Sequence, residues 1–156
     1  MTNETNKMIL LEQYKLYASS ADDMTKRRTE MNKMYLAMIL ALFTVGTFLG
    51  SKEILDKFDA YTMLVLLSLI GIALSITWYV NIDSYKRLNK AKFNVIHKME
   101  EELSFMCFKE EYILLKSQHT NKKKYKNLTK VEKYLPIFFG IIFFVILMIS
   151  TCNQYS

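Results

Sequence analysis

The groups on which most enzyme chemistry depends are scarce in this sequence. Its 156 residues include only four glycines, two cysteines and two histidines. No Gly-rich phosphate loop and no G-x-S-x-G nucleophile motif occurs. With only two cysteines, Cys107 and Cys152, the chain has no disulfide framework, and these cysteines do not have the spacing of a zinc site with His97 and His119. We therefore expect a protein that is not an enzyme and that uses no metal or cofactor.

Charged residues are absent from three long stretches, although they make up 23% of the chain. The uncharged stretches are residues 34–50, 61–80 and 135–151. About 20 apolar residues cross a hydrocarbon core of ~30 Å, and ~17 is the practical minimum. The stretches therefore predict three membrane-spanning helices. Because the spans contain no Asp, Glu, Lys, Arg or His that could relay protons or couple ions, they do not support a secondary transporter.

The distribution of basic residues predicts the orientation of these spans. Residues 1–33 carry six Lys or Arg, residues 81–134 carry thirteen, and the 51–60 link carries two. Because basic loops stay inside, we expect a cytoplasmic helical segment at 1–33 and a cytoplasmic helix and basic loop at 81–134. The other predicted domains are a transmembrane hairpin at 34–80, with spans at 34–50 and 61–80, and a third transmembrane helix at 135–151. We expect the C-terminus to lie outside. Lysine outnumbers arginine 18 to 3, which is typical of AT-rich bacterial genomes.

Two charged segments keep an apolar face at alternating spacings of three and four residues. The first seam comprises Leu10, Tyr14, Tyr17, Ala21, Met24, Arg28, Met31, Tyr35 and Met38. The second comprises Ile82, Tyr85, Asn89, Lys92, Ile96, Met99, Leu103, Met106 and Glu110. Such spacing predicts helix packing of coiled-coil type. We expect an all-α membrane protein: a long helical hairpin whose cytoplasmic extensions pack together. The capping-box spacing of Ser20 and Asp23 leaves open a helix break near residue 20.

Small and polar residues within the helices are candidate packing sites. Gly46 and Gly50 have G-x-x-x-G spacing, and Gly71 with Ser75 repeats the small-x-x-x-small pattern. Small residues let helix backbones approach in a membrane, and contact within one chain or between chains explains the pattern equally well. Asn89 interrupts the second seam. An Asn there either fixes the register and oligomeric state or marks the edge of the seam.

A basic cluster precedes the third span and comprises Lys122, Lys123, Lys124 and Lys126. Such clusters gain about 1 kcal/mol per basic residue near an anionic leaflet, so anionic lipid is the expected partner. The alternative is a solvated loop that only sets topology. We expect the acidic block of residues 100–102 to be a solvated face; the alternative is that it pairs with this lysine run on a neighbouring helix. A net charge of +6 raises the question of nucleic-acid binding, but no motif for it occurs and none is expected.

The sequence from Trp78 to Phe105, preceded by the segment from Leu10 to Arg28, resembles the RipA family of small bacterial membrane proteins. The resemblance covers roughly residues 10–115 and implies an octameric inner-membrane protein, a relative of which supports intracellular growth of a pathogen. Ser104 and Phe105 stand where family members often have Leu-Pro. The matching residues are Trp78, Tyr79, Ser84, Tyr85, Leu88, Asn89, Ala91, Lys92, Phe93, Val95, Ile96 and Glu100.

The architecture is also similar to the two-span SLATT effectors of antiphage systems, which implies a membrane-damaging protein. Two functions therefore have to be compared. One is a non-enzymatic homo-oligomer that organises the membrane or a complex with an unknown membrane protein partner. The alternative is a pore-forming or membrane-disrupting effector. The hydroxyls of Thr44, Thr47, Ser68 and Ser75 form a faintly polar stripe, which a pore lining and close helix packing explain equally well.

Overall fold

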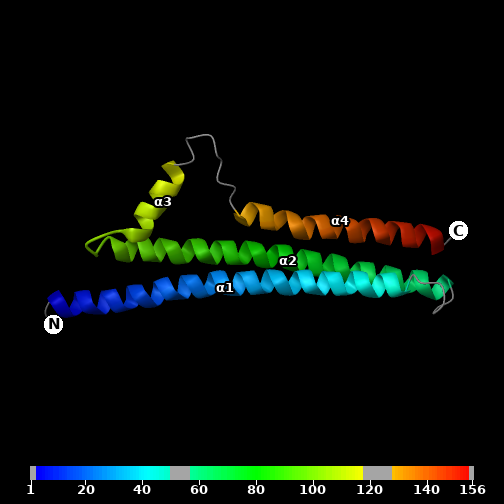
Figure 1. Ribbon diagram of the computed structural model, residues 1–156, viewed down its shortest axis with the longest axis horizontal. Helices are drawn as coiled ribbons and strands as arrows, with labels where there is room; N and C mark the ends of the chain where they lie inside the picture. Colours follow the sequence, from blue (N-terminus) through cyan, green and yellow to red (C-terminus); the bar gives the residue numbers. More distant parts are fainter. Residues whose placement is uncertain (1–2, 50–56, 118–127, 155–156) are drawn as a thin grey trace. The chain divides into compact units, whose positions relative to one another are not determined.

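The computed structural model describes residues 3–49, 57–117 and 128–154, and these residues form four α-helices and no strand (Figure 1). The helices are α1 Asn3–Leu49, α2 Lys57–Glu100, α3 Cys107–Ser117 and α4 Leu128–Gln154. Each of α1, α2 and α4 is long and apolar enough to cross a membrane. The predicted all-α membrane protein, with a C-terminal candidate span, is therefore confirmed.

Helix α1 continues without interruption past the capping-box residues, so the break considered near residue 20 does not occur. Ser20 accepts a hydrogen bond from the Lys92 ammonium, and its hydroxyl is used for a helix–helix contact. Asp23 lies 3.8 Å from Lys26, one turn further along the same helix. With no Gly or Pro before Gly46, the backbone has no local reason to leave the helical conformation.

The chain folds as two compact units, to which α1 and α2 both contribute. We name the first the extramembrane unit; it comprises Met1–Arg28 and Ser84–Asn127. The second, the membrane unit, comprises Thr29–Asp83 and Leu128–Ser156 and contains the three uncharged stretches.

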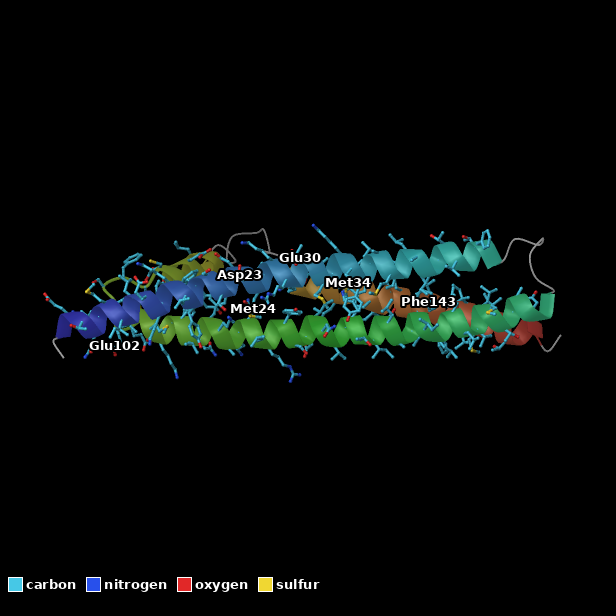
Figure 2. All side chains as sticks on the ribbon, turned by 90° about the horizontal axis from the view of Figure 1, so that it is seen from below. Asp23, Met24, Glu30, Met34, Glu102 and Phe143 are labelled. Atoms are coloured by element: carbon cyan, nitrogen blue, oxygen red, sulfur yellow. The ribbon has the colours of Figure 1, made fainter. Side chains whose placement is uncertain are left out.

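Aromatic side chains from three helices form the core of the membrane unit. The rings of Phe43 on α1 and Phe143 on α4 stack with centroids 4.9 Å apart. The Tyr35 ring of α1 stacks on Trp78 of α2 at 5.9 Å, and Trp78 lies 6.4 Å from Phe139. Figure 2 shows Phe143 among the side chains where α1, α2 and α4 meet. Aromatic rings suit this position because they fill a large volume and stack favourably.

The predicted seams hold α1 against α2 in the extramembrane unit. Ala21 of the first seam and Ile96 of the second are buried. We expected the second seam to continue to Glu110 in one helix. It does not, because α2 ends at Glu100. The chain then turns, with Leu103 N–H donating to the carbonyl of Glu100 at 3.0 Å. It starts again as α3 at Cys107.

Candidate functional site

The small residues of the second span receive α4 of the same chain. A Cβ added to Gly71 would lie 2.5 Å from ring atoms of Phe143, closer than real carbon atoms approach. A Cβ added to Gly140 would meet the Cβ of Ser75 at 3.5 Å, which is ordinary contact. Gly71 and Ser75 are both buried in this contact. Their small size therefore allows α4 to pack closely on α2, as small residues do between membrane helices.

Only the first glycine of the Gly46–Gly50 motif lies among the residues that the structure describes. A Cβ at Gly46 would lie 3.3 Å from a terminal methyl carbon of Leu67, so this glycine allows α1 and α2 to approach within one chain. Its motif partner, Gly50, lies outside the described residues. The four lysines predicted to bind lipid, Lys122, Lys123, Lys124 and Lys126, also lie outside them.

The hydroxyl groups of the spans are bound within their own helices. Thr44 and Thr47 donate to the carbonyls of Leu40 and Thr44 at 2.9 and 2.8 Å. Ser68 and Ser75 donate to the carbonyls of Leu64 and Gly71 at 2.7 and 2.9 Å. Both serines are buried, whereas both threonines are exposed. The four hydroxyls therefore do not share one accessible polar face.

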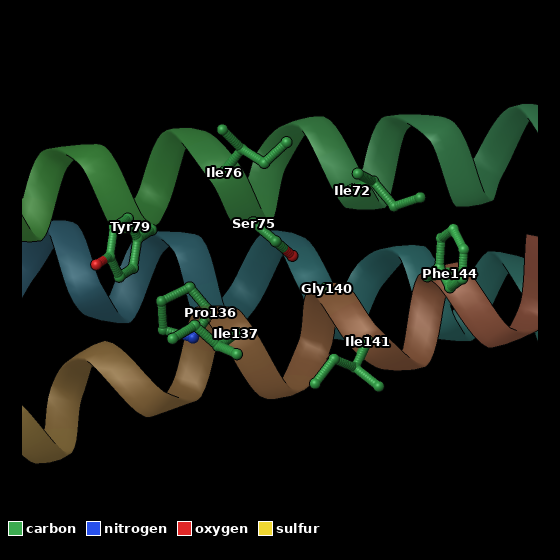
Figure 3. Close-up of a pocket in the computed structure, with 9 residues that line it drawn as sticks. All are labelled: Ile72, Ser75, Ile76, Tyr79, Pro136, Ile137, Gly140, Ile141 and Phe144. Carbon is green, nitrogen blue, oxygen red and sulfur yellow. The ribbon is translucent and has the colours of Figure 1, made fainter.

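An apolar groove of about 400 Å³ runs between α2 and α4 (Figure 3). Its polar groups are the hydroxyls of Ser75 and Tyr79, and the other seven lining residues are apolar. It offers no acid, base or thiol, so it can hold only apolar chains or helix side chains. The lining residues are Ile72, Ser75, Ile76 and Tyr79 of α2, with Pro136, Ile137, Gly140, Ile141 and Phe144 of α4.

Polar side chains connect α1 to α2 next to the aromatic core. The indole N–H of Trp78 donates to Oδ1 of Asn32 at 2.9 Å. The side-chain amide of Asn81 donates to the hydroxyl of Tyr35. These hydrogen bonds pair polar groups at the end of an apolar contact. A buried polar group left without a partner there would cost free energy.

An ion pair connects α4 to α2 in the same unit. Lys133 donates to the carboxylate of Asp83, and both side chains are half-buried. The Lys133 ammonium also lies 5.0 Å from the ring centroid of Tyr79, within the range of a cation–π interaction. The start of α4 is therefore fixed to α2 by charge as well as by packing.

Glu100 is the most enclosed acidic residue among those described. Its side chain is fully buried, and Oε1 accepts hydrogen bonds from Phe108 N–H at 2.8 Å and from the Tyr14 hydroxyl at 3.1 Å. Oε2 accepts from Lys109 N–H at 3.2 Å. The carboxylate thus occupies the N-terminus of α3, where unpaired N–H groups and the helix dipole favour a negative charge.

The expectation that residues 100–102 form a solvated face is therefore wrong for Glu100. Three hydrogen-bond donors replace the water molecules that would solvate the Glu100 carboxylate, and they offset the free-energy cost of burying its charge. Burial, followed by the hydrogen bond and the charge of Glu100, raises the pKa of Tyr14 from 10.0 to about 12. The sequence gives one signal for this role, because Glu100 lies four residues after Ile96 and so on the buried face of α2.

Asn89 lies between α1 and α2 of one chain. It lines a small cavity of the extramembrane unit with Met24, Thr25, Arg28 and Tyr85. Its Oδ1 is buried and has no hydrogen-bond partner among the described residues. This position makes Asn89 a residue of the intrachain seam.

Lys92, the other polar residue of the second seam, also faces α1. Its ammonium donates to Ser20 and lies 5.7 Å from the ring centroid of Tyr17. Both interruptions of the apolar seam are therefore accommodated inside the α1–α2 contact.

Comparison with known proteins adds one match. A family model described as "Octameric membrane protein family (8xMP)" matches residues 11–152. No curated protein and no solved structure is significantly similar to the chain.

Proposed function

We propose that this chain, which belongs to the octameric membrane protein family, is a non-enzymatic homo-oligomer that organises the bacterial inner membrane or a partner complex within it. The family match confirms the octameric membrane family implied by the motif from Trp78 to Phe105, although its description does not mention RipA. The Lys and Arg distribution supports a cytoplasmic N-terminus and a C-terminus on the outer side.

The packing of the spans is the observation that carries this proposal. Ser68 and Ser75 are buried and bonded within α2, and Phe43 stacks on Phe143 in the core. The three uncharged stretches contain no ionisable residue that could form a charged ring. Conducting pores use polar or charged linings to replace the hydration of ions. The spans therefore support a structural assembly better than a conductive one.

The alternative function is a pore-forming or membrane-disrupting effector. Thr44 and Thr47 favour it, because they are exposed on adjacent turns of α1 and could line a pore. Purified protein in liposomes tests the two functions. We expect no release of a small dye or of potassium ions, and no loss of membrane potential when expression is induced in cells. Rapid release that Thr44→Val with Thr47→Val abolishes, while Thr62→Val does not, would establish the effector instead.

Anionic lipid is the small partner that we propose. The support is the density of positive charge at Lys122, Lys123, Lys124 and Lys126, close to the start of a span. Changing all four to Gln should remove any preference for anionic over zwitterionic liposomes at low salt. Four Lys→Gln changes at exposed positions, Lys7, Lys15, Lys26 and Lys33, are the matched control. If only the control loses the preference, the cluster has a topological role and lipid binds elsewhere.

A further inference from the structure

Helix α2 has a second apolar stripe that the described part of its own chain does not cover. Leu88, Ala91 and Val95 follow spacings of three and four residues, and Leu88 and Val95 are 52% and 37% exposed. Val95 lies about 100° around the helix from the buried Ile96, so the stripe lies on the flank of α2, beside the α1 contact and not within it. These residues belong to the extramembrane unit, and the five Lys or Arg among residues 84–98 favour a position outside the hydrocarbon core. Apolar stripes of this kind outside a membrane mark interaction surfaces.

The α2 stripe lies on a strongly basic segment. Residues 84–98 contain five Lys or Arg and no Asp or Glu. Lys92 turns toward Ser20 of its own chain. The remaining basic residues are Lys86, Arg87, Lys90 and Lys98.

The outer face of α1 has the opposite charge and its own exposed apolar residues. Residues 3–23 carry four acidic and two basic side chains, and all four acidic residues are exposed. Leu16 is 71% exposed, and Met8 and Ile9 are exposed as well. Figure 2 labels Asp23 on this part of α1.

We propose that the α2 stripe of one chain packs against the outer face of α1 of a second copy of this chain. The occupant is a second copy because the family is octameric, so each chain must offer surfaces to its neighbours. The two faces are opposite in charge, which favours their association and fixes their register. Because they are different surfaces, the contact is head-to-tail and can repeat from copy to copy until a ring closes.

The contacts within one chain define the register of this interface. Tyr14 meets Glu100 and Ser20 meets Lys92, so Leu16 stands level with the part of α2 that contains Val95. A ring axis along the membrane normal keeps equivalent residues of every copy at one height. We therefore place Leu16 opposite Val95 of the neighbour, and Asp23 opposite Lys90. Leu88 lies two turns, or about 10 Å, from that level.

Co-expression of two differently tagged chains tests the contact, with Cys107 and Cys152 changed to Ser in both. One chain carries Leu16→Cys and the other Val95→Cys, and the membranes are treated with a disulfide-forming catalyst. We expect a cross-linked dimer that carries both tags. Leu88→Cys is the off-level control, and Ile113→Cys on α3, which is 48% exposed, is the control for collisions. Each should give at least tenfold less product with Leu16→Cys.

Charge reversal provides a second test. Lys90→Glu should weaken subunit association roughly tenfold, and adding Asp23→Lys should restore it. A cross-link between two Leu16→Cys chains would overturn the proposal in favour of a symmetric contact. The inference rests on the proposed homo-oligomer, and native mass spectrometry separates the two. An octamer that lacks the Leu16–Val95 product overturns this interface alone, whereas a monomer overturns both.

Discussion

The ring of Phe143 occupies the space that a side chain at Gly71 would need. A Cβ built on Gly71 lies 2.5 Å from the Cγ and Cδ1 atoms of that ring, which comes from a different helix. The closest approach of α4 to α2 therefore depends on the absence of one methyl group.

Gly71→Ala should separate α4 from α2. The added methyl group must displace the Phe143 ring, and such overpacking costs about 1–3 kcal/mol. Thermal unfolding in detergent, followed by circular dichroism, measures the change. Gly140→Ala is the matched control, since its Cβ meets Ser75 at 3.5 Å and needs no movement. Equal melting temperatures for the two variants would contradict the packing described here.

Glu100→Ala should release the start of α3. The change removes the acceptor for Phe108 N–H, Lys109 N–H and the Tyr14 hydroxyl, and the lost cap costs about 2 kcal/mol. Hydrogen exchange should show faster exchange at the amides of Phe108 and Lys109. Glu101→Ala, at an exposed position, should leave both amides protected. Unchanged protection in the Glu100 variant would mean that other contacts hold the helix.

The stability of the extramembrane unit should fall at high pH through Tyr14. Folding raises the pKa of this residue from 10.0 to about 12, so the folded chain favours the neutral phenol. The stability that it contributes is complete below pH 10 and is lost as pH rises toward about 12. Tyr14→Phe should therefore lose less stability over this window than the unchanged chain.

Chemical denaturation at several pH values in that window measures the loss. Tyr112→Phe is the control, because this tyrosine lies exposed on α3. If Tyr14→Phe and the unchanged chain lose equal stability, the phenol of Tyr14 does not contribute to the dependence.

Asn89→Leu should change the stability of one chain and leave the number of subunits unchanged. The buried Oδ1 has no hydrogen-bond partner among the described residues, so an apolar side chain of similar shape is expected to stabilise the seam by up to about 1 kcal/mol. Native mass spectrometry and thermal unfolding report the two properties separately. Asn94→Leu, on an exposed position of α2, is the control. A shift in stoichiometry confined to the Asn89 variant would return this residue to a role in assembly.

The three spans, the seams and the family could be predicted from the sequence because each depends on local order along the chain. An uncharged run of 20 residues, such as 61–80, is long enough to cross a bilayer whatever surrounds it. The alternating spacings place Ala21 on the apolar face of α1 and Ile96 on the apolar face of α2, and both residues are buried. The motif from Trp78 to Glu100 needed only residue types at fixed spacing.

Contacts between distant residues had to come from the tertiary structure. The end of α2 at Glu100 depends on a carboxylate that meets Tyr14, 86 residues earlier, and the first turn of α3. Its place four residues after Ile96 indicates the buried face of α2, but no local pattern identifies the donors that bind its carboxylate. The spacing of Gly71 and Ser75 predicted close packing, but it could not say whether the partner was α4 or another chain. Phe143 decides the partner. A small residue only makes room for a neighbouring helix, and the side chain that fills this room determines which helix packs there.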